Sequence, residues 1–265
     1  MPLPFAGNPI GRPFIELPST DSTNKYAMAI VHGAALPHGQ YGPQHGMAVF
    51  AHEQTEGKGQ RGKTWTSEKE ANIAISILLN PYPLSLTEQF KLSVCVAVSV
   101  AEFFLKYAGD ETKIKWPNDL YWRDRKAGGV LIENIVSGAQ STAPLWRWAV
   151  AGIGINVNQT NFPDDLPNPV SLKQITGKNF IPVELAKELC SCLENNYQQL
   201  LSNGFEELFT RYQHFLYKKN EQVKLKKDTR VFEATIKGVS SSGQLITHHS
   251  IEERFDFGEV EWVIA

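Results

Sequence analysis

A short loop rich in glycine and positive charge is the first segment with an evident chemical use. Residues 57–64 read GKGQRGKT, and Trp65 follows them. Glycines let a backbone approach a ligand closely, and Lys58, Arg61 and Lys63 supply the positive charge that an anion needs. The Trp65 indole is suited to stacking on a flat ring. The loop is therefore typical of a site for phosphate and nucleotide.

The same letters satisfy the P-loop pattern G-x-x-x-x-G-K-[ST], but the surrounding sequence does not. A P-loop needs a helix that opens at its last glycine, because the helix N-terminus binds the anion. Residues 65–70 leave room for one or two helical turns at most, and an alternating β-branched strand follows. No apolar strand ends in an Asp or Glu that would hold magnesium. We therefore favour a flexible nucleotide loop over a P-loop NTPase.

Two other segments share the character of this loop. In residues 113–119 (KIKWPND) a lysine, an amide and a carboxylate meet at a proline turn, and residues 125–129 (RKAGG) follow closely. Glycines inside a strand mark the close approach of a ligand or of another backbone. Residues 152–158 (GIGINVN) hold a lone G-x-G, which a tight crossing of strands explains about as well as a site does. This last segment therefore stays open between the two interpretations.

The hydrophobic pattern predicts the strands that must position these residues. Strands are predicted at 13–17, 47–52, 73–79, 112–116, 120–123, 126–136 and 146–157. Period-two alternation is clearest in the third of them. Because the last four runs are spaced as hairpins, the sheet should be largely antiparallel or mixed.

Helices are predicted from caps and from the 3.6-residue period. A helix over 23–32 follows a capping cluster, and a capping box at residues 85–88 opens a helix that runs to about 107. Between residues 92 and 105 that helix is apolar on nearly all sides, so it should lie in the interior. Two amphipathic helices, separated by Gly204, are predicted after the proline-rich loop at 162–169.

After Lys219 the pattern changes to short alternating segments. Turns rich in serine, glycine and charge separate them, which predicts a small all-β module of about 45 residues. A basic run from Lys218 to Arg230 is interleaved with acidic residues. It is more often a solvated face than a nucleic-acid patch, although it would also suit steering of an acidic protein partner.

Composition excludes several classes of protein. The chain has 265 residues, 42% of them hydrophobic, and a formal net charge of -2. This is too apolar for a disordered chain and too nearly neutral for a protein whose main partner is bulk nucleic acid. No apolar run approaches the roughly 18 residues of a membrane span, and the N-terminal residues do not resemble a signal peptide. Three cysteines, without C-x-x-C, fit a reducing compartment, so we expect a cytoplasmic protein.

Five segments, in their order along the chain, resemble the biotin protein ligases. They are residues 21–24 (DSTN), 53–65 (EQTEGKGQRGKTW), 115–119 (KWPND), 125–133 (RKAGGVLIE) and 152–156 (GIGIN). The resemblance covers about residues 14–160, and residues 258–260 (GEV) look like a turn of the family's small C-terminal barrel.

The resemblance implies an α+β fold of the class II aminoacyl-tRNA synthetase and biotin ligase type. This fold has a mixed, largely antiparallel sheet with flanking helices. Residues 1–219 would form the catalytic domain and residues 220–265 a small SH3-like β-barrel. The first matched strand begins near Pro13, so we expect a monofunctional ligase without the DNA-binding winged helix of dual-role members.

The resemblance also implies two half-reactions. Biotin and MgATP give biotinyl-5′-AMP, and biotin then passes to a lysine of a biotin carboxyl carrier domain. Because the biotin carboxylate and the α-phosphate are both anions, the task is positioning and charge neutralisation, without a covalent nucleophile. The partner would be the carrier protein of a biotin-dependent carboxylase, with no DNA and no membrane. The ligase itself would be a monomer or a homodimer.

Site residues follow from the same resemblance. Those implied for catalysis are Lys126, Lys58, Lys115 and Asp119. Those implied for biotin are Ser22, Thr23, Asn24, Gln54, Gly57, Lys58, Gly59, Gln60, Lys126, Gly128 and Gly129. Those implied for the nucleotide are Lys58, Arg61, Trp65, Lys115, Asn118, Lys126 and Asn156. Asp119 is expected either to hold magnesium or to orient the incoming lysine amine.

The glycine-rich loop departs from the family pattern G-R-G-R-R-G-R at two positions. Lys58 keeps the charge but lacks the bidentate fork of arginine, and Gln60 lacks the charge as well. Retention of the reactive adenylate is therefore expected to be looser, or to depend more on Lys58 and Lys126.

Three alternatives remain beside the biotin ligase. A lipoate or octanoyl ligase or transferase would share the fold and the lysine-bearing strand, but not the charged loop followed by Trp65. A P-loop NTPase would depend on Lys63. A non-catalytic binding module, such as an inactive biotin sensor, would not need the phosphate chemistry that Lys115, Asn118 and Lys126 suggest.

Overall fold

The computed structural model describes residues 8–33, 42–138, 145–164 and 166–263. The elements before residue 160 are β1 (Phe14–Leu17), α1 (Thr23–Val31), β2 (Ala48–Ala51), η1 (Gln60–Gly62), β3 (Ile73–Leu79), η2 (Leu86–Glu88), α2 (Gln89–Ala108), β4 (Thr112–Lys115), β5 (Asp119–Trp122), β6 (Arg125–Ser137) and β7 (Leu145–Ile155). Those after it are α3 (Leu172–Thr176), α4 (Pro182–Leu201), α5 (Phe205–Phe215), β8 (Gln222–Lys227), β9 (Arg230–Val239), β10 (Leu245–His248), β11 (Glu252–Phe255) and β12 (Glu261–Trp262).

The first seven strands form one mixed sheet in the order β1-β2-β3-β7-β6-β5-β4. Only β1 and β2, which α1 separates in the sequence, pair in parallel. The other neighbours pair antiparallel; β4 to β7 follow one another as hairpins, whereas β3 pairs with β7 across a long separation in the sequence. The predicted fold class is confirmed. The short helix α3 and the strand β11 were not foreseen from the sequence.

Strand β3 explains how the sheet separates two layers of side chains. Ile73, Ile75 and Ile77 point into the main core, which they share with the apolar residues of α2. Leu78 points to the opposite face and packs with Ala27 and other residues of α1. This alternation is the period of two that predicted the strand. One face of the sheet therefore lies under α2, while the other face lies under α1.

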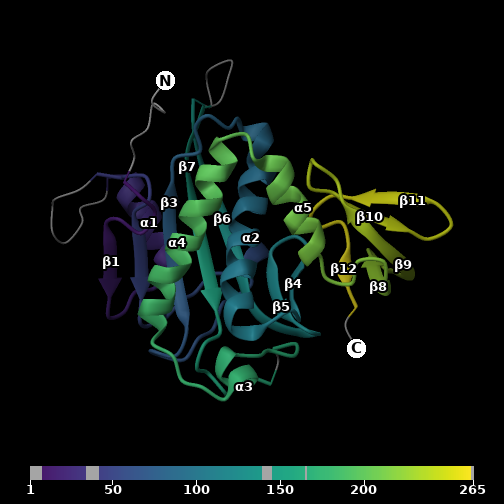
Figure 1. Cartoon of the computed structure of the whole chain (residues 1–265), viewed down its shortest axis with the longest axis horizontal. Helices are drawn as coiled ribbons and strands as arrows, with labels where there is room; N and C mark the ends of the chain where they lie inside the picture. The colour runs from purple at the N-terminus through teal and green to yellow at the C-terminus, as the bar shows by residue number, and fades with distance from the viewer. Residues whose placement is uncertain (1–7, 34–41, 139–144, 165, 264–265) are drawn as a thin grey trace.

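Helices α2, α4 and α5 pack together against the main-core face (Figure 1). At the start of α2, the Ser85 amide donates to the Glu88 carboxylate at 3.0 Å, as expected for the capping box. Side chains from Leu92 to Phe104 are mostly buried, which confirms the predicted interior position.

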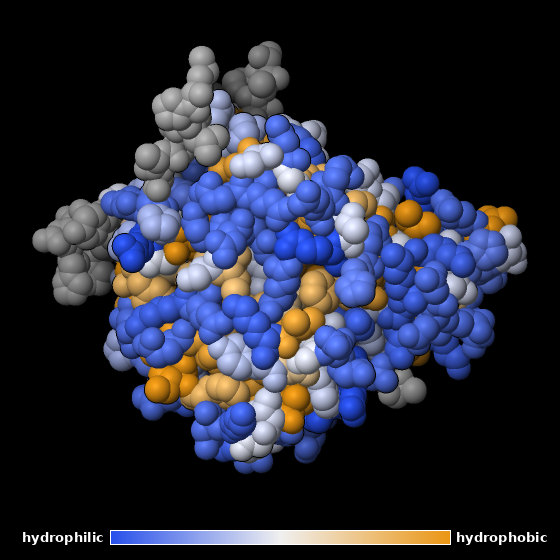
Figure 2. Space-filling model, viewed as in Figure 1, coloured by the Kyte–Doolittle hydropathy of each residue, from blue (hydrophilic) through white to orange (hydrophobic). Residues whose placement is uncertain are grey.

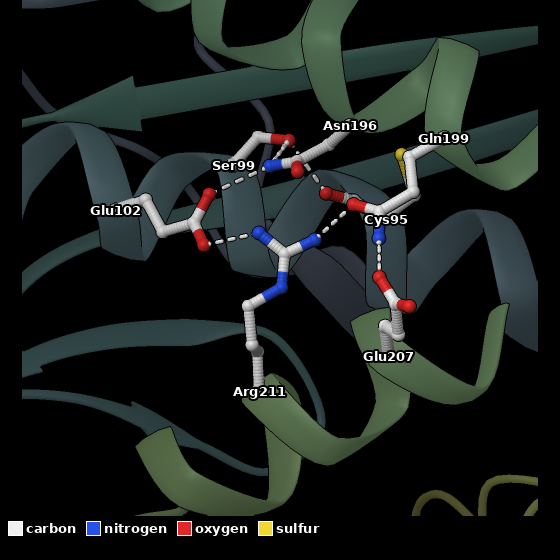
Figure 3. A network of polar contacts seen from close by, with 7 residues as sticks. All are labelled: Cys95, Ser99, Glu102, Asn196, Gln199, Glu207 and Arg211. Atoms are coloured by element: carbon white, nitrogen blue, oxygen red, sulfur yellow. Dashed lines mark hydrogen bonds and ion pairs between the residues drawn. The ribbon is translucent and has the colours of Figure 1, made fainter. Parts of the chain in front are cut away.

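A polar network joins these three helices where their apolar faces meet (Figure 3). Arg211 of α5 donates to Glu102 of α2 at 2.5 Å and also to Gln199 of α4. Asn196 of α4 donates to Glu102 at 2.8 Å and to the Ser99 hydroxyl at 3.0 Å. Each of these partly buried polar groups thus has a partner, and the network fixes how the helices lie against one another.

The last five strands form a second, antiparallel sheet in the order β11-β10-β9-β8-β12. This C-terminal β module was predicted, and its apolar residues, Leu225 and Ile236 among them, continue the main core. The Trp116 indole N–H donates to the Gly243 carbonyl at 2.9 Å across the junction. A domain boundary at residue 219 remains a proposal.

The surface is mostly hydrophilic in the view of Figure 2, with separate apolar patches. Two strongly exposed hydrophobic residues of the second sheet are Val231 and Ile251. Among the described residues, no helix has the length and apolar character needed to cross a bilayer.

Candidate functional site

The candidate site lies on the α1 face of the main sheet, where small residues leave room. In the sheet register Gly129 lies opposite Gly154, and Leu131 and Ser76 flank Gly152. A Cβ added at Gly154 would lie 2.6 Å from the Trp65 ring, and one added at Gly152 would lie 2.1 Å from the Asn24 side chain. The absence of side chains at Gly152 and Gly154 thus leaves a hollow in β7, which Asn24 and Trp65 occupy. Both of these residues were predicted to bind ligand. Contact of these two glycines with a ligand remains a prediction.

The glycine-rich loop is a narrow hairpin above this hollow. Gly59 and Lys63 are linked by an amide-to-carbonyl hydrogen bond of 2.7 Å, and the Trp65 amide donates to the Gly57 carbonyl at 2.9 Å. The 3-10 turn η1 forms the tip, and no α-helix opens at residues 62–64. A P-loop requires that helix, so its absence here confirms the sequence interpretation against a P-loop.

A cavity of about 650 Å³ lies between the loop, α1 and β6. It is lined by Lys25, Thr55, Glu56, Gly57, Lys58, Gly59, Arg61, Gly62, Lys63, Thr64, Leu131 and Glu133. Sequence reasoning overlooked Lys25, Glu56 and Glu133, although the last two belong to matched segments. The Lys25 ammonium lies 2.5 Å from Glu56 and 3.1 Å from Asp21, so it joins the base of the loop to the start of α1. The lining thus mixes cations with carboxylates.

The residues predicted for the biotin ring meet in a buried polar network. Gln54 accepts hydrogen bonds from the Thr23 amide at 2.8 Å and from its hydroxyl at 3.1 Å. The Ser76 hydroxyl lies 2.7 Å from the Thr23 hydroxyl and 2.5 Å from Oδ1, the side-chain amide oxygen of Asn24. The Asn24 amide in turn donates to Glu133 at 2.8 Å. Ser22, beside them at the start of α1, is 1% exposed. Sequence reasoning missed Ser76, because a lone serine in a strand carries no motif.

Lys126 and Asp119 form an ion pair at the junction of β5 and β6. The Lys126 ammonium lies 2.7 Å from an Asp119 oxygen, and both side chains are about one-third exposed. A Cβ at Gly129 would lie 3.2 Å from the same oxygen, so a glycine at this position leaves the pair uncrowded. Asn118 fixes the turn before β5, because its side-chain amide donates to the Val130 carbonyl. The sequence segments 115–119 and 125–133 are therefore one local structure.

Lys115 differs from the other site cations in its burial. It is 8% exposed, and its ammonium lies 3.2 Å from the Tyr121 hydroxyl and 5.3 Å from the centre of the Trp262 ring. Burial lowers the pKa of Lys115 to about 8, against the opposing effect of Asp119. The positive charges of Lys126 and Lys63 lower this pKa further. Cations from two other segments are therefore close enough to act on Lys115.

Asn156 and Gly128 hold the chain around Lys126. The Asn156 side chain is 5% exposed and donates to the Val170 carbonyl at 3.1 Å. A Cβ at Gly128 would lie 2.6 Å from the Gly154 carbonyl oxygen, so this glycine is required by the packing of β6 on β7. Contact of either residue with a ligand remains a prediction.

The described residues contain no group of three or more His, Cys, Asp or Glu side chains arranged to hold a metal ion. Asp119, the predicted metal ligand, has one oxygen in the ion pair with Lys126. The protein alone does not supply the ligands for a resident metal there.

Comparison with known proteins agrees with this geometry. Residues 17–144 match the model of the biotin/lipoate A/B protein ligase family. The bifunctional ligase/repressor BirA of Bacillus subtilis is 34% identical over 164 residues, which cover 60% of this chain and 48% of that protein. The biotin–[acetyl-CoA-carboxylase] ligase of Paracoccus denitrificans is 28% identical over 239 residues, covering 87% and 92%. This chain therefore spans about half the length of the Bacillus relative.

A solved structure is similar over nearly the whole chain. The biotin protein ligase of Aquifex aeolicus in complex with biotin and ATP has a TM-score of 0.74 and 25% sequence identity. The similarity covers 95% of this chain and 98% of that protein.

Proposed function

We propose that the chain is an ATP-dependent biotin–protein ligase of the biotin/lipoate A/B protein ligase family. It would activate biotin as biotinyl-5′-AMP and transfer it to a lysine of a biotin carboxyl carrier protein. The Paracoccus relative is named a biotin–[acetyl-CoA-carboxylase] ligase, and the Aquifex ligase was solved in complex with both biotin and ATP. These similarities support the proposal for this chain.

The observation that carries the proposal is the gathering of cations around Lys115. Lys63 of the glycine-rich loop and Lys126 of β6, which is paired with Asp119 at 2.7 Å, both lower the pKa of Lys115 on β4. A reaction between a carboxylate and a phosphate must overcome repulsion between two anions. A preorganised cluster of ammonium groups offsets that repulsion, and it does so most strongly where water is excluded.

In the first half-reaction a carboxylate oxygen of biotin attacks the α-phosphorus of ATP. The bond from that phosphorus to the bridging oxygen breaks, and pyrophosphate leaves with the electron pair. Lys126 would lie between the carboxylate and the α-phosphate, while Lys58, Lys115 and Arg61 would contact the phosphates. Magnesium would enter with ATP as part of the substrate, because the described protein side chains form no resident metal site.

In the second half-reaction the neutral amine of the acceptor lysine attacks the acyl carbon. AMP leaves with the electron pair, the amine loses a proton, and an amide bond results. Asp119 is the carboxylate paired with Lys126, and it would either orient that amine or help hold the magnesium of ATP. The polar network of Thr23, Asn24 and Gln54 would recognise the ureido ring, whose N–H groups donate and whose carbonyl accepts.

The test is biotin-dependent exchange of labelled pyrophosphate into ATP. Lys126→Ala should reduce the exchange rate by about 10²–10³, the cost of removing one group that stabilises charge in a transition state. Lys237→Ala is the control, because Lys237 is exposed on β9 outside the site. Wild-type exchange with lipoate and none with biotin would move the assignment to the lipoate branch of the family. Release of ADP and phosphate would instead indicate NTPase chemistry.

A further inference from the structure

The tip of the glycine-rich loop rests on the C-terminal sheet. The Arg61 guanidinium carbon lies 5.7 Å from the centre of the Phe257 ring, within the range of a cation–π contact. Phe257 and Gly258 belong to the turn that joins β11 and β12. A Cβ added at Gly258 would lie 2.6 Å from an Arg61 nitrogen, so a side chain there would collide with the guanidinium. The two residues together form a seat for one arginine.

The backbone of Arg61 indicates that its position is held from outside the loop. Its φ is 54° and its ψ is 40°, in the left-handed region that residues other than glycine rarely adopt. Such a conformation persists where surrounding structure over-determines it. The side-chain partners that the structure gives Arg61 are Phe257 and Gly258. The contact between the loop tip and the C-terminal sheet is therefore the candidate cause of the left-handed backbone conformation at Arg61.

The seat itself is anchored to the catalytic part of the chain. The Trp116 ring contacts the Phe257 ring edge to face at 6.1 Å, and the Trp116 N–H donates to the Gly243 carbonyl at 2.9 Å. Trp116 belongs to the segment that also carries Lys115 and Asp119. The Arg61 seat thus has a fixed position relative to the lysine cluster.

We propose that the Phe257–Gly258 turn is a latch that holds the glycine-rich loop closed through Arg61. Phe257 and Gly258 are positioning residues in this scheme, since they act on the site through Arg61. The functional part rests on the proposed ligase activity: loop opening is the route by which the acyl adenylate escapes before transfer. Because Gln60 at the tip is uncharged, Arg61 is the cation that η1 offers to the latch.

Hydrogen exchange of the ligand-free protein tests the latch without assuming any substrate. The amides of Gly59 and Lys63 donate within the loop hairpin at 2.7 and 3.1 Å, so their exchange reports loop opening. Phe257→Leu keeps an apolar side chain but removes the ring, and should speed this exchange about two- to fivefold, the size expected of an exposed cation–π contact. Phe257→Tyr keeps a ring and should exchange as the wild type does.

Two further variants decide between a latch and a general loosening. Val231→Ala alters another exposed apolar side chain of the same sheet and should leave loop exchange unchanged. Arg61→Leu should speed exchange as Phe257→Leu does, and the double variant should add nothing further, because both remove one contact. Equal exchange in Phe257→Leu and wild type, or an equal effect of Val231→Ala, would overturn the latch.

The release rate of biotinyl-5′-AMP then tests its functional role. Release should rise in Phe257→Leu by the same factor as loop exchange, and Phe257→Tyr should restore the wild-type rate. Faster exchange with unchanged release would refute the role of the latch in retention. A wild type that forms no adenylate would refute the proposed ligase activity alone, because the exchange result stands independently.

Discussion

At the residue scale, Lys115 and Lys126 are both site cations but have different surroundings. Lys126 is about one-third exposed and paired with Asp119, whereas Lys115 is 8% exposed and lies among aromatic rings. Water and the carboxylate stabilise the charge on Lys126. Asp119 favours the charged form of Lys115, and the faces of Tyr121 and Trp262 also lie near its ammonium, but together they compensate only partly for lost hydration.

This difference predicts a pH dependence of adenylate formation. Lys115 has a pKa of about 8, lowered mainly by burial, so it is positively charged below pH 8 and loses its proton as pH rises through that value. If Lys115 contacts the phosphates as proposed, loss of its charge should slow pyrophosphate exchange above about pH 8. Lys115→Arg should extend activity to higher pH, because a guanidinium stays charged. The measurement is the exchange rate between pH 6.5 and 9.5, and identical profiles for wild type and Lys115→Arg would contradict the prediction.

Gln60 supports a second prediction at this scale. It stands in the glycine-rich loop where the family pattern has arginine, and it cannot pair with a phosphate anion. Gln60→Arg should therefore slow release of biotinyl-5′-AMP, by about tenfold if one charge-assisted hydrogen bond is gained. Release is measured by rapid dilution of the preformed complex. Gln222→Arg, which adds the same charge at an exposed position of β8, serves as the control and should release at the wild-type rate. An unchanged rate in Gln60→Arg would count against the prediction.

At the scale of elements, one face of the main sheet carries the hydrophobic core and the other face carries the candidate site. Strand β3 gives Ile73, Ile75 and Ile77 to the core under α2, and gives Ser76 to the polar network under α1. Gly152 and Gly154 of β7 leave space on the α1 side of the sheet that Asn24 and Trp65 occupy. Helices α2, α4 and α5 pack on the other face and contribute none of the described residues that line the cavity.

The helix network predicts a stability effect separable from activity. Arg211→Met should lower the free energy of unfolding by about 1–2 kcal/mol, because Glu102 loses a charged hydrogen-bond donor in a partly buried position. Urea denaturation measures the change. The matched control is Arg254→Met, whose ion pair with Glu252 is more than half exposed and should contribute less than about 0.5 kcal/mol. Equal decreases in the free energy of unfolding in the two variants would show that the helix network stabilises the protein no more than an exposed ion pair does.

At the scale of the whole molecule, the C-terminal sheet is part of the site. Trp262 lies against Lys115, and Phe257 lies against Arg61, so the sheet contacts two cations of the catalytic part. The outer face of β8 presents Lys224 and Lys226 to solvent, beside Arg230 at the start of β9.

The basic face predicts salt-dependent transfer to an acidic carrier protein. Charge attraction raises the association rate, and salt screens it. The specificity constant for the carrier should fall with added sodium chloride, and Lys224→Glu with Lys226→Glu should lower it about two- to tenfold at low salt. Pyrophosphate exchange, which needs no carrier, is the control and should not change. Salt-insensitive carrier kinetics would contradict the prediction.

The sequence by itself determined the elements and the chemical character of the site. Periodicity predicted the strands and the interior helix α2, because burial on one or both faces leaves a regular trace in residue type. Motifs marked the segments of residues 53–65, 115–119 and 125–133, because close approach and charge require particular residues at short spacing.

Only the tertiary structure decided how those segments meet. The glycines of the G-x-G at residues 152–154 make room for Asn24 and Trp65, and only the folded sheet shows that these residues lie against them. The seat of Arg61 on Phe257 joins positions almost two hundred residues apart, and Ser76 joins the network under α1 with no motif to mark it. Such contacts depend on which distant strands pair, and the alternation of residue types within one strand shows its buried face but not its partner.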